Sequence, residues 1–371
     1  MLNIKKLRSR PRQFRLFVGL SVEEFDQLMA QVVLQYASQE ERRLTRSTRR
    51  RAVGGGHPFT LTLEARLLAT LLYYRLHLTG LVLECLFGLS ESNLGRERNQ
   101  RMMPVLLEVL PIPMQDHLLS ALEEKSGKPS SSGKPSGSGK PSSSGKPSGS
   151  TGRSRKRIGT LKELLEAYPE LRDLCVDGTE QEVPKPQNKR DKKHFYSGKG
   201  HCHTVKTQVT TAKRLVLHIM GGTPGSMADR QMLKASGVLR GISEAASPMK
   251  RKARQGKRAA KKSKRRVRLD RGYSGLEQTG SPEKCEYGSL PGLEVLAALK
   301  GSGQKKLTAL GKAWNYVLVS PQRMQVEQNI GHLKNWRVLS GLFRADKERH
   351  ESTFAVVAGL HNFHILGSLS W

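Results

Sequence analysis

The sequence predicts an α/β domain that is preceded by a small all-helical domain. Residues 1–125 repeat apolar side chains at helical spacing. Residues 161–371 instead combine helical stretches with short strand-like runs, at 174–176, 204–211 and 215–219. Between the two parts, residues 126–160 are rich in Gly, Lys, Pro and Ser. Such a segment has too little apolar surface to offset its ordering entropy, so we interpret it as a flexible linker.

The charge balance indicates the class of partner. The chain has 371 residues, and 64 Lys and Arg stand against 32 Asp and Glu, which gives a net charge of +32. This excess favours nucleic acid as the partner. An acidic membrane surface would require an amphipathic or lipidated anchor, and the sequence shows neither. Ribosomal and other RNA-binding proteins share such a charge, so the charge does not define an activity.

The cysteines and the apolar segments indicate the compartment. The four cysteines are scattered without Cys-x-x-Cys spacing, which fits a reduced compartment and not a disulfide framework. The most apolar segment, residues 67–89, is interrupted by Arg75, His77 and Glu84. We therefore expect buried helices, no membrane span and no signal peptide. A cytoplasmic, nucleoid-associated protein fits these features.

Three short helices are predicted within about residues 61–105, in the arrangement of a helix-turn-helix. They cover 61–76, 80–87 and 91–103, and Thr79 and Ser90 are placed to cap the second and third. The third helix would enter the DNA major groove. Its predicted DNA-contacting residues are Asn93, Arg96, Gln100 and Arg101. An ordinary helical hairpin gives the same pattern, so the residues alone favour the two equally.

Three other local patterns come from capping residues and basic composition. Ser21 and Glu24 have capping-box spacing and predict a helix start. The cationic tract 42–51 fits a solvated linker or a DNA-backbone contact equally well. Residues 244–268 are interpreted as a basic insertion, because residues 250–268 contain twelve Lys or Arg and no acid.

Within residues 161–371, the expected elements place two aspartates at strand ends. A strand at 174–176 ends at Asp177, and an extended basic loop covers 185–199. A glycine-rich turn at 221–226 precedes a helix at 229–239. A short, charged strand ends at Asp270, and residues 293–299 are expected to be helical.

A third acid is expected on the helix Arg323–Lys334. Glu327 lies four residues after Arg323 and seven before Lys334, so one helix face carries all three. Alone, this is the pattern of an exposed ion-pair ladder. Two strand-end acids and one helix acid can also hold two Mg²⁺ or Mn²⁺ ions roughly 3.5–4 Å apart, the arrangement that drives displacement at phosphorus.

Five motifs in order carry a resemblance to a known family. They are Asp177-Gly-Thr-Glu180, the pair Tyr196-Ser-Gly-Lys199 and His203-Thr-Val-Lys206, Pro224-Gly-Ser-Met-Ala-Asp229, Asp270-Arg-Gly-Tyr273 and the Glu327 to Lys334 segment. Together they resemble the DDE transposases of bacterial insertion sequences, in the branch related to Harbinger elements. The likeness covers most of residues 161–366, and the helix-turn-helix resembles that family's N-terminal part.

The resemblance implies an RNase H-like domain with a mixed sheet. Asp177, Asp270 and Glu327 would be its catalytic residues and metal ligands, with two Mg²⁺ or Mn²⁺ ions as cofactors. It also implies DNA cleavage and strand transfer at terminal inverted repeats, with a homodimer in the synaptic complex. Arg323, Lys334, Lys199 and Lys206 would contact DNA. The family's tyrosine three residues before Arg323 is Ser320 here, which leaves its role in DNA distortion unfilled.

Several neighbouring residues carry a second interpretation. For Asp229, a structural role at a helix start is favoured over metal ligation. For Glu180, a hydrogen bond in a loop is favoured over metal contact. Tyr273 fits base stacking or core packing equally. The crowded residues 201–203 fit a strand better than a zinc site.

Two rival functions remain open at the level of sequence. A decayed or repurposed copy would bind DNA through the same helices without cutting it, and the two basic low-complexity segments favour that possibility. A basic RNA-binding protein would explain the charge and would leave the three acids without a role.

Overall fold

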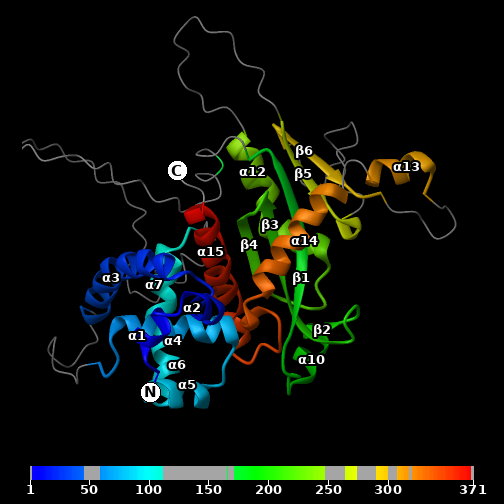
Figure 1. Ribbon diagram of the computed structural model, residues 1–371. Helices are drawn as coiled ribbons and strands as arrows, with labels where there is room; N and C mark the ends of the chain where they lie inside the picture. Colours follow the sequence, from blue (N-terminus) through cyan, green and yellow to red (C-terminus); the bar gives the residue numbers. More distant parts are fainter. Residues whose placement is uncertain are drawn as a thin grey trace, which may run out of the picture.

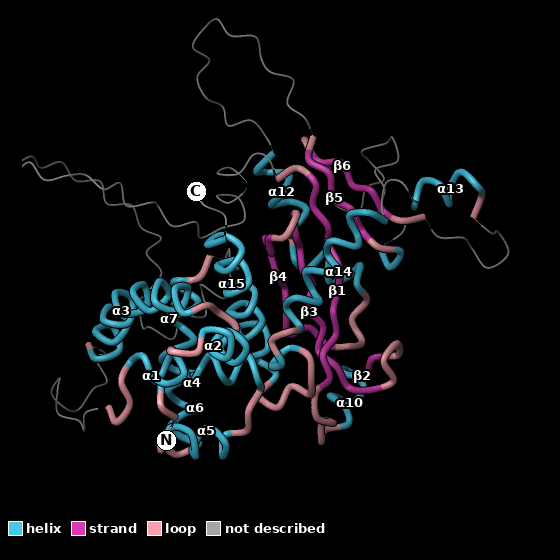
Figure 2. The backbone as a smooth tube through the Cα atoms, in the orientation of Figure 1, coloured by secondary structure: helices cyan, strands magenta, loops and turns pink. Residues whose placement is uncertain are grey.

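The computed structural model describes residues 2–45, 59–111, 165, 171–246, 264–273, 290–299, 307–316 and 320–368. An N-terminal group of helices packs beside a mixed sheet that carries helices on both faces (Figures 1 and 2). The predicted linker at 126–160 lies outside the described residues, as does most of the predicted basic insertion. The two ends of that 244–268 range belong to regular elements, a helix ending at Ala246 and a strand starting at Arg265.

The N-terminal region is helical throughout its described part, as predicted. Its elements are α1 (Ile4–Arg8), α2 (Pro11–Val18), α3 (Val22–Leu44), α4 (Leu63–Leu76), α5 (Gly80–Phe87), α6 (Glu91–Arg96), the π-helical segment η1 (Glu97–Met102) and α7 (Met103–Val109). The capping box at the start of α3 is confirmed, because Ser21 Oγ accepts from the Glu24 N–H and Glu24 accepts from the Ser21 N–H.

The sheet has six strands and mixed direction. They are β1 (Asp173–Glu182), β2 (Tyr196–Ser197), β3 (Cys202–Ala212), β4 (Leu215–Pro224), β5 (Arg265–Leu269) and β6 (Leu293–Ala297). β1, β3 and β4 pair in antiparallel fashion, while β1, β5 and β6 run parallel, and β2 extends one end of β3. This is the connectivity of an RNase H-like domain, so the predicted fold class is confirmed.

The remaining elements of this domain are helices and single turns. They are α10 (Lys189–Phe195), α11 (Asp229–Ser236), α12 (Val238–Ala246), α13 (Ala309–Trp314), α14 (Ser320–Lys334) and α15 (His350–Ser368), with single turns η2 (Arg271–Tyr273), η5 (Arg337–Leu339) and η6 (Lys347–Arg349). α14 and α15 pack on one face, and α11 and α12 pack on the other, over a core that includes Val176 and Leu269. None of the helices in the described ranges is both long and apolar enough to cross a bilayer.

Four expectations for this domain were wrong. β1 does not end at Asp177 but continues to Glu182, because β3 pairs with it along that whole length. Residues 293–297 form β6 and not a helix, since pairing with β5 buries them in the sheet. The basic loop 185–199 contains α10, and the first part of the glycine-rich turn at 221–226 is the end of β4.

The helical region and the sheet domain share one hydrophobic core. Buried residues of α2, α3, α4 and α7 belong to the same cluster as β4 and α15 residues such as Val216 and Val356. The α15 side chain Asn362 donates to the Pro111 carbonyl at 3.0 Å and pairs with the Val216 backbone. Arg75 of α4 donates to the Asn335 carbonyl at 2.9 Å. The two regions are therefore packed together directly (Figure 1).

Candidate active site and DNA-binding helices

Strand pairing brings the two aspartates together. β1 and β5 are parallel neighbours, with Val176 opposite Leu269. Asp177 and Asp270 follow these two residues in the chain, so they lie side by side on adjacent strands. Because strand side chains alternate between faces, Asp177 points to the face that α14 covers. A pocket on this face is lined by both aspartates and by Arg268 and Arg323.

Glu327 approaches from α14. Val326 is buried against the sheet, and Asn329 donates to the Lys213 carbonyl at 2.8 Å, which fixes the helix over β1 and β3. Glu327 itself remains exposed at the rim. Asp177, Asp270 and Glu327 therefore reach one region from two strands and one helix.

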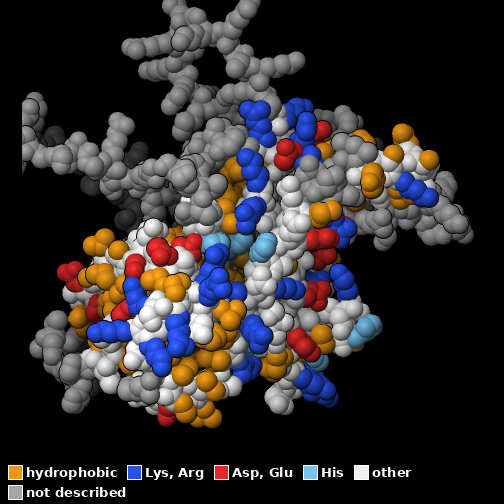
Figure 3. Space-filling view, viewed as in Figure 1, with side chains coloured by type: hydrophobic (Ala, Val, Ile, Leu, Met, Phe, Trp, Pro, Cys, Tyr) orange, Lys and Arg blue, Asp and Glu red, His pale blue; other side chains and the backbone are white. Residues whose placement is uncertain are grey.

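Arg323 connects two of the acids. Its Nη1 lies 2.8 Å from Asp270 Oδ1, and its Nε lies 3.1 Å from Glu327 Oε1. Both are charge contacts without hydrogen-bond geometry, because Asp270 Oδ1 and Arg323 Nε are buried atoms with no hydrogen-bond partner in the described residues. Acidic and basic side chains lie together over α14 and β1 in the space-filling view (Figure 3). The arginine thus balances the repulsion between Asp270 and Glu327.

Asp177 is partly buried beside Asp270. Burial raises the pKa of Asp177 to about 6. The Gly178 N–H, which donates to Asp177 Oδ1 at 2.8 Å, opposes this rise, while Asp270 and Glu327 increase it and Arg323 again opposes it. A cation bound beside Asp177 would stabilise its ionised form.

The side chains of Asp177, Asp270 and Glu327 are of the chemical type that binds a hard divalent cation. Carboxylate oxygens are the ligands that Mg²⁺ and Mn²⁺ prefer, and the buried Asp270 Oδ1 lacks a hydrogen-bond donor. Within the described ranges, no group of three or more His, Cys, Asp or Glu side chains is arranged to hold a metal ion. The acids are gathered at one place, and the Arg323 guanidinium lies between two of them.

The predicted lysine contacts are placed very differently. Lys199 is exposed in the turn between β2 and β3. Lys334 is half-buried at the end of α14, where burial lowers its pKa and Glu180 opposes the shift. Lys206 is 13% exposed and is held by the Met227 carbonyl, Asp229 and Glu180. Lys199 is therefore accessible at the surface, whereas Lys206 is engaged in internal contacts.

The residues with two interpretations are also placed by the fold. Tyr273 is buried and packs in the core beneath β1 and β5. Glu180 lies in β1 and not in a loop, and it accepts a hydrogen bond from Thr204 Oγ1 at 2.9 Å. Asp229 is the first residue of α11, and the capping position itself is Ala228. Cys202 and His203 lie in β3, as the strand interpretation required.

The predicted helix-turn-helix is formed by α4, α5 and the continuous helix of α6 and η1. Thr79 Oγ1 accepts from the Val82 N–H at the start of α5, as predicted. Ser90 makes no such bond, and Glu84 Oε2 accepts from the Glu91 N–H at 2.9 Å instead. Gly88 has φ of 69°, a left-handed conformation that glycine adopts easily, and so allows the tight turn.

One face of the third helix is free for recognition. Asn93, Arg96 and Gln100 are exposed at helical spacing, and Arg96 donates to Asn93 at 3.1 Å. Arg101 points elsewhere, since its Nη1 lies 2.5 Å from the buried Glu97 and its guanidinium lies over Phe59. The exposed trio fits base and phosphate contacts, whereas Arg101 supports the helix from inside.

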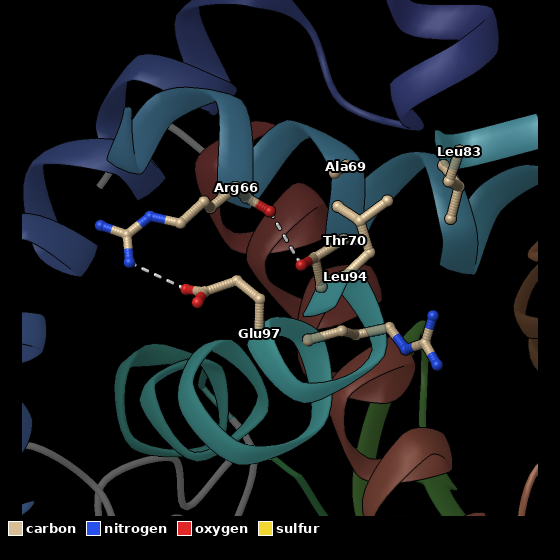
Figure 4. Close-up of a pocket in the computed structure, with 7 residues that line it drawn as sticks. Arg66, Ala69, Thr70, Leu83, Leu94 and Glu97 are labelled. Carbon is tan, nitrogen blue, oxygen red and sulfur yellow. Dashed lines mark hydrogen bonds and ion pairs between the residues drawn. The ribbon is translucent and has the colours of Figure 1, made fainter. Parts of the chain in front are cut away.

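A buried ion pair behind this helix was not predicted. Arg66 of α4 donates to Glu97 at 2.9 Å, and these side chains are 7% and 5% exposed (Figure 4). The Arg66 guanidinium also lies over the rings of Tyr36 and Phe59, at 4.8 and 4.2 Å from their centroids. The Glu97–Arg101 spacing was visible in the sequence, but the partner from α4 is 31 positions away and only the fold reveals it.

The fold and the gathered acids together define a nuclease-like protein of the RNase H-like class. Residues 176–362 match the family model described as DDE superfamily endonuclease, and residues 59–111 match the helix-turn-helix of DDE superfamily endonuclease. The chain therefore belongs to the DDE superfamily endonucleases and carries their helix-turn-helix. The more specific Harbinger-related branch stays a prediction.

A curated relative points in the same direction. The chain is 26% identical over 205 residues to a probable transposase for insertion sequence element IS702 from Microchaete diplosiphon. The matched part covers 55% of this chain and 61% of that relative. No solved structure matches the chain.

Proposed function

We propose that this protein is a DNA transposase that binds the terminal inverted repeats of its element and catalyses metal-dependent strand cleavage and transfer. The observation that carries the proposal is the Arg323 guanidinium within 3.1 Å of both Asp270 and Glu327, beside the half-buried Asp177. Three acids from three separate segments share one patch, which is what a two-metal site at phosphorus requires.

The proposed roles follow from the chemistry of each group. Asp177, Asp270 and Glu327 would hold two divalent ions, Mg²⁺ or Mn²⁺. When bound, such ions activate water or a 3′-hydroxyl and stabilise the departing oxygen. The Gly178 N–H orients the Asp177 carboxylate toward the site. Arg323 and Lys334 lie on the same helix as Glu327, and their charges suit the phosphates of a bound strand.

The helix-turn-helix supplies recognition of the element ends. Asn93, Arg96 and Gln100 form its exposed face and contact the DNA, while Lys199 adds a phosphate contact near the sheet. Joining two ends in one synaptic complex calls for two copies of the chain, so we propose a homodimer on DNA. The proposed partner places the protein at the nucleoid.

Strand cleavage with purified protein tests the enzymatic part. The protein with Mg²⁺ or Mn²⁺ should nick or join DNA that carries the element's ends. Asp177→Asn, Asp270→Asn and Glu327→Gln should each reduce the product below detection. Glu294→Gln is the matched control, because Glu294 is an exposed carboxylate on β6 whose ion pair with Arg266 lies at the surface. Full activity in any of the three variants would remove that residue from the proposed site.

A second candidate is a repurposed DNA-binding protein without cleavage activity. The two Arg323 ion pairs favour it, since they occupy carboxylates that an active site would offer to metal. Isothermal titration with Mn²⁺ separates the candidates. An active site should show binding heat that Asp177→Asn removes, whereas a closed site should show none.

A further inference from the structure

A second charged cluster lies on the back of β1, opposite the three acids. Lys206 Nζ lies 2.9 Å from the Met227 carbonyl, 3.3 Å from Asp229 Oδ1 and 3.4 Å from Glu180 Oε1. We call Lys206, Glu180 and Asp229 the rear cluster. Its three oxygen partners match the three N–H donors of one ammonium group. The lysine side chain is 13% exposed, and those of Glu180 and Asp229 are 23% and 39% exposed, so the ammonium group is the buried centre of a partly exposed cluster.

The rear cluster joins three elements. Glu180 lies in β1 directly opposite Lys206 in β3, and Asp229 begins α11. A carboxylate in the first turn of a helix is stabilised by the partial positive charge of that helix end. The contact with the Met227 carbonyl also ties down the segment that precedes α11. Lys206 therefore fixes the start of α11 against the sheet.

Two glycines let the Asp229 carboxylate approach the segments that carry the catalytic aspartates. A Cβ added at Gly272 would lie 3.1 Å from Asp229 Oδ2, and one added at Gly178 would lie 3.6 Å from Oδ1. Gly178 follows Asp177 and donates to its carboxylate, and Gly272 lies two residues after Asp270. Neither glycine has a positive φ. The close approach of the Asp229 carboxylate, and not the backbone conformation, therefore explains why glycine stands at these two positions.

We infer that Lys206 and Asp229 form a positioning pair that sets the spacing between Asp177 and Asp270. The Asp229 carboxylate lies close to Gly178, which follows Asp177, and to Gly272, which lies two residues after Asp270, and Lys206 holds Asp229 in place. Asp229 is not a ligand in this arrangement, because it lies beside Gly178, which alternates with Asp177 along β1 and so faces the opposite side of the sheet from the three acids. The inference rests on the proposed function, in which the two aspartates bind metal.

Metal affinity measured by titration calorimetry with Mn²⁺ tests the pair. Asp229→Asn and Lys206→Met should each weaken binding by about tenfold, as is common when residues that support metal ligands are changed. Lys206→Arg, which keeps the charge, should recover most of the loss. Asp346→Asn is the control, because this carboxylate is 73% exposed and its ion pair lies at the surface. Thermal midpoints measured alongside report whether each variant is folded.

The glycines give a second test, in which a neighbouring side chain displaces Asp229 without replacing it. Gly272→Ala should weaken Mn²⁺ binding because its Cβ displaces Asp229, whereas Gly178→Ala meets Asp229 only at ordinary contact distance. In protein that already carries Asp229→Ala, adding Gly272→Ala should cause no further loss of Mn²⁺ affinity. Equal effects of Gly272→Ala with and without Asp229 would overturn the pairing.

The outcomes separate the inference from the proposed function. Wild-type protein that binds Mn²⁺ no better than Asp177→Asn contradicts the proposed function and the inference with it. Suppose that Asp177→Asn removes Mn²⁺ binding, whereas Asp229→Asn and Lys206→Met leave it unchanged. This result overturns the inference alone. If Asp229→Asn abolishes Mn²⁺ binding and Lys206→Met does not change it, Asp229 is itself a metal ligand. This result also overturns the inference.

Discussion

Arg323 contacts both Asp270 and Glu327. Because of this position, we expect it to weaken Mn²⁺ binding and to promote strand cleavage. Removing its charge frees the acids from a competing cation, so Arg323→Ala should tighten Mn²⁺ binding by roughly two- to fivefold, the range expected for partly exposed ion pairs. The same change removes a charge that suits DNA phosphate, so strand cleavage should fall. Calorimetry and a cleavage assay on one preparation check both directions.

Arg323→Lys is the control for that prediction. A lysine keeps the positive charge and cannot reach both carboxylates with one planar group. Mn²⁺ affinity close to that of the wild type is expected for this variant. Weaker Mn²⁺ binding in Arg323→Ala would contradict the proposed competition.

His350 provides a pH-dependent contribution to stability. It is 1% exposed, and burial lowers its pKa to about 4. Its Nε2 donates to Gln181 Oε1, since the Gln181 amide already donates to the Val338 and Gly341 carbonyls. An unfolded histidine has a pKa near 6.5. Between pH 6.5 and 4, His350 is protonated in the unfolded protein and neutral in the folded protein. The contribution of His350 to the free energy of unfolding is therefore complete above pH 6.5 and is lost as the pH falls toward 4.

The expected loss from His350 is about 1 kcal/mol between pH 7.5 and 5.5. His350→Gln keeps a donor for Gln181 and removes the titration, so its stability should fall less over this interval. Urea unfolding of both proteins at the two pH values gives the difference, because the other histidines contribute to both. An equal loss in the two proteins would show that His350 does not cause it.

At the scale of single elements, two arginines of the third helix of the helix-turn-helix have different expected roles. Arg96 would contact DNA, and Arg101 would stabilise the helix. Arg96 is exposed, so Arg96→Ala should lower affinity for the specific DNA end by about 1–3 kcal/mol and leave stability unchanged. Arg101 supports the buried Glu97, so Arg101→Ala should lower stability as well. DNA-binding titrations and chemical unfolding check the two variants.

Arg12→Ala is the control for these two changes. Arg12 is an exposed arginine on α2, outside the helix-turn-helix. Its loss should weaken binding to specific and unrelated DNA alike by reducing net charge. If Arg96→Ala behaves in the same way as Arg12→Ala, Arg96 does not read the element end.

The elements differ in how far their local sequence predicts them. α5 and the strands β3 and β4 were predicted near their observed positions, because caps and side-chain periodicity act within a few positions. Residues 293–297 were expected to be helical, and only their pairing with β5 makes them a strand. Asp177 was expected at a strand end, and the long partner β3 extends the strand past it. Such errors arise where a distant partner outweighs local preference.

For the whole molecule, the shared core predicts that the helical region and the sheet domain unfold together. Gly359 on α15 faces Leu110, and a Cβ added there would lie 2.6 Å from the Leu110 Cβ. Gly359→Ala should therefore destabilise the protein by about 1–3 kcal/mol through overpacking. Urea unfolding followed by helix content and by tryptophan fluorescence should give coincident transitions, shifted together in the variant.

Gly331→Ala is the matched control for this interface. Gly331 lies on α14, and a Cβ added there meets no atom within 4 Å among the described residues. Alanine favours helix over glycine, so this variant should be as stable as the wild type or up to about 1 kcal/mol more stable. Separate transitions for the two regions would contradict the shared core.

The sequence by itself determined the class of partner, the three short helices of the N-terminal region, and the identity of the three candidate acids. These features rest on composition and on short motifs, which operate within a few residues of chain. The tertiary structure alone decided that Arg323 joins two of those acids, that Lys206 faces inward, and that the two regions share one core. Such contacts join residues that are far apart in the chain or on different elements, and only packing brings their side chains within reach of one another.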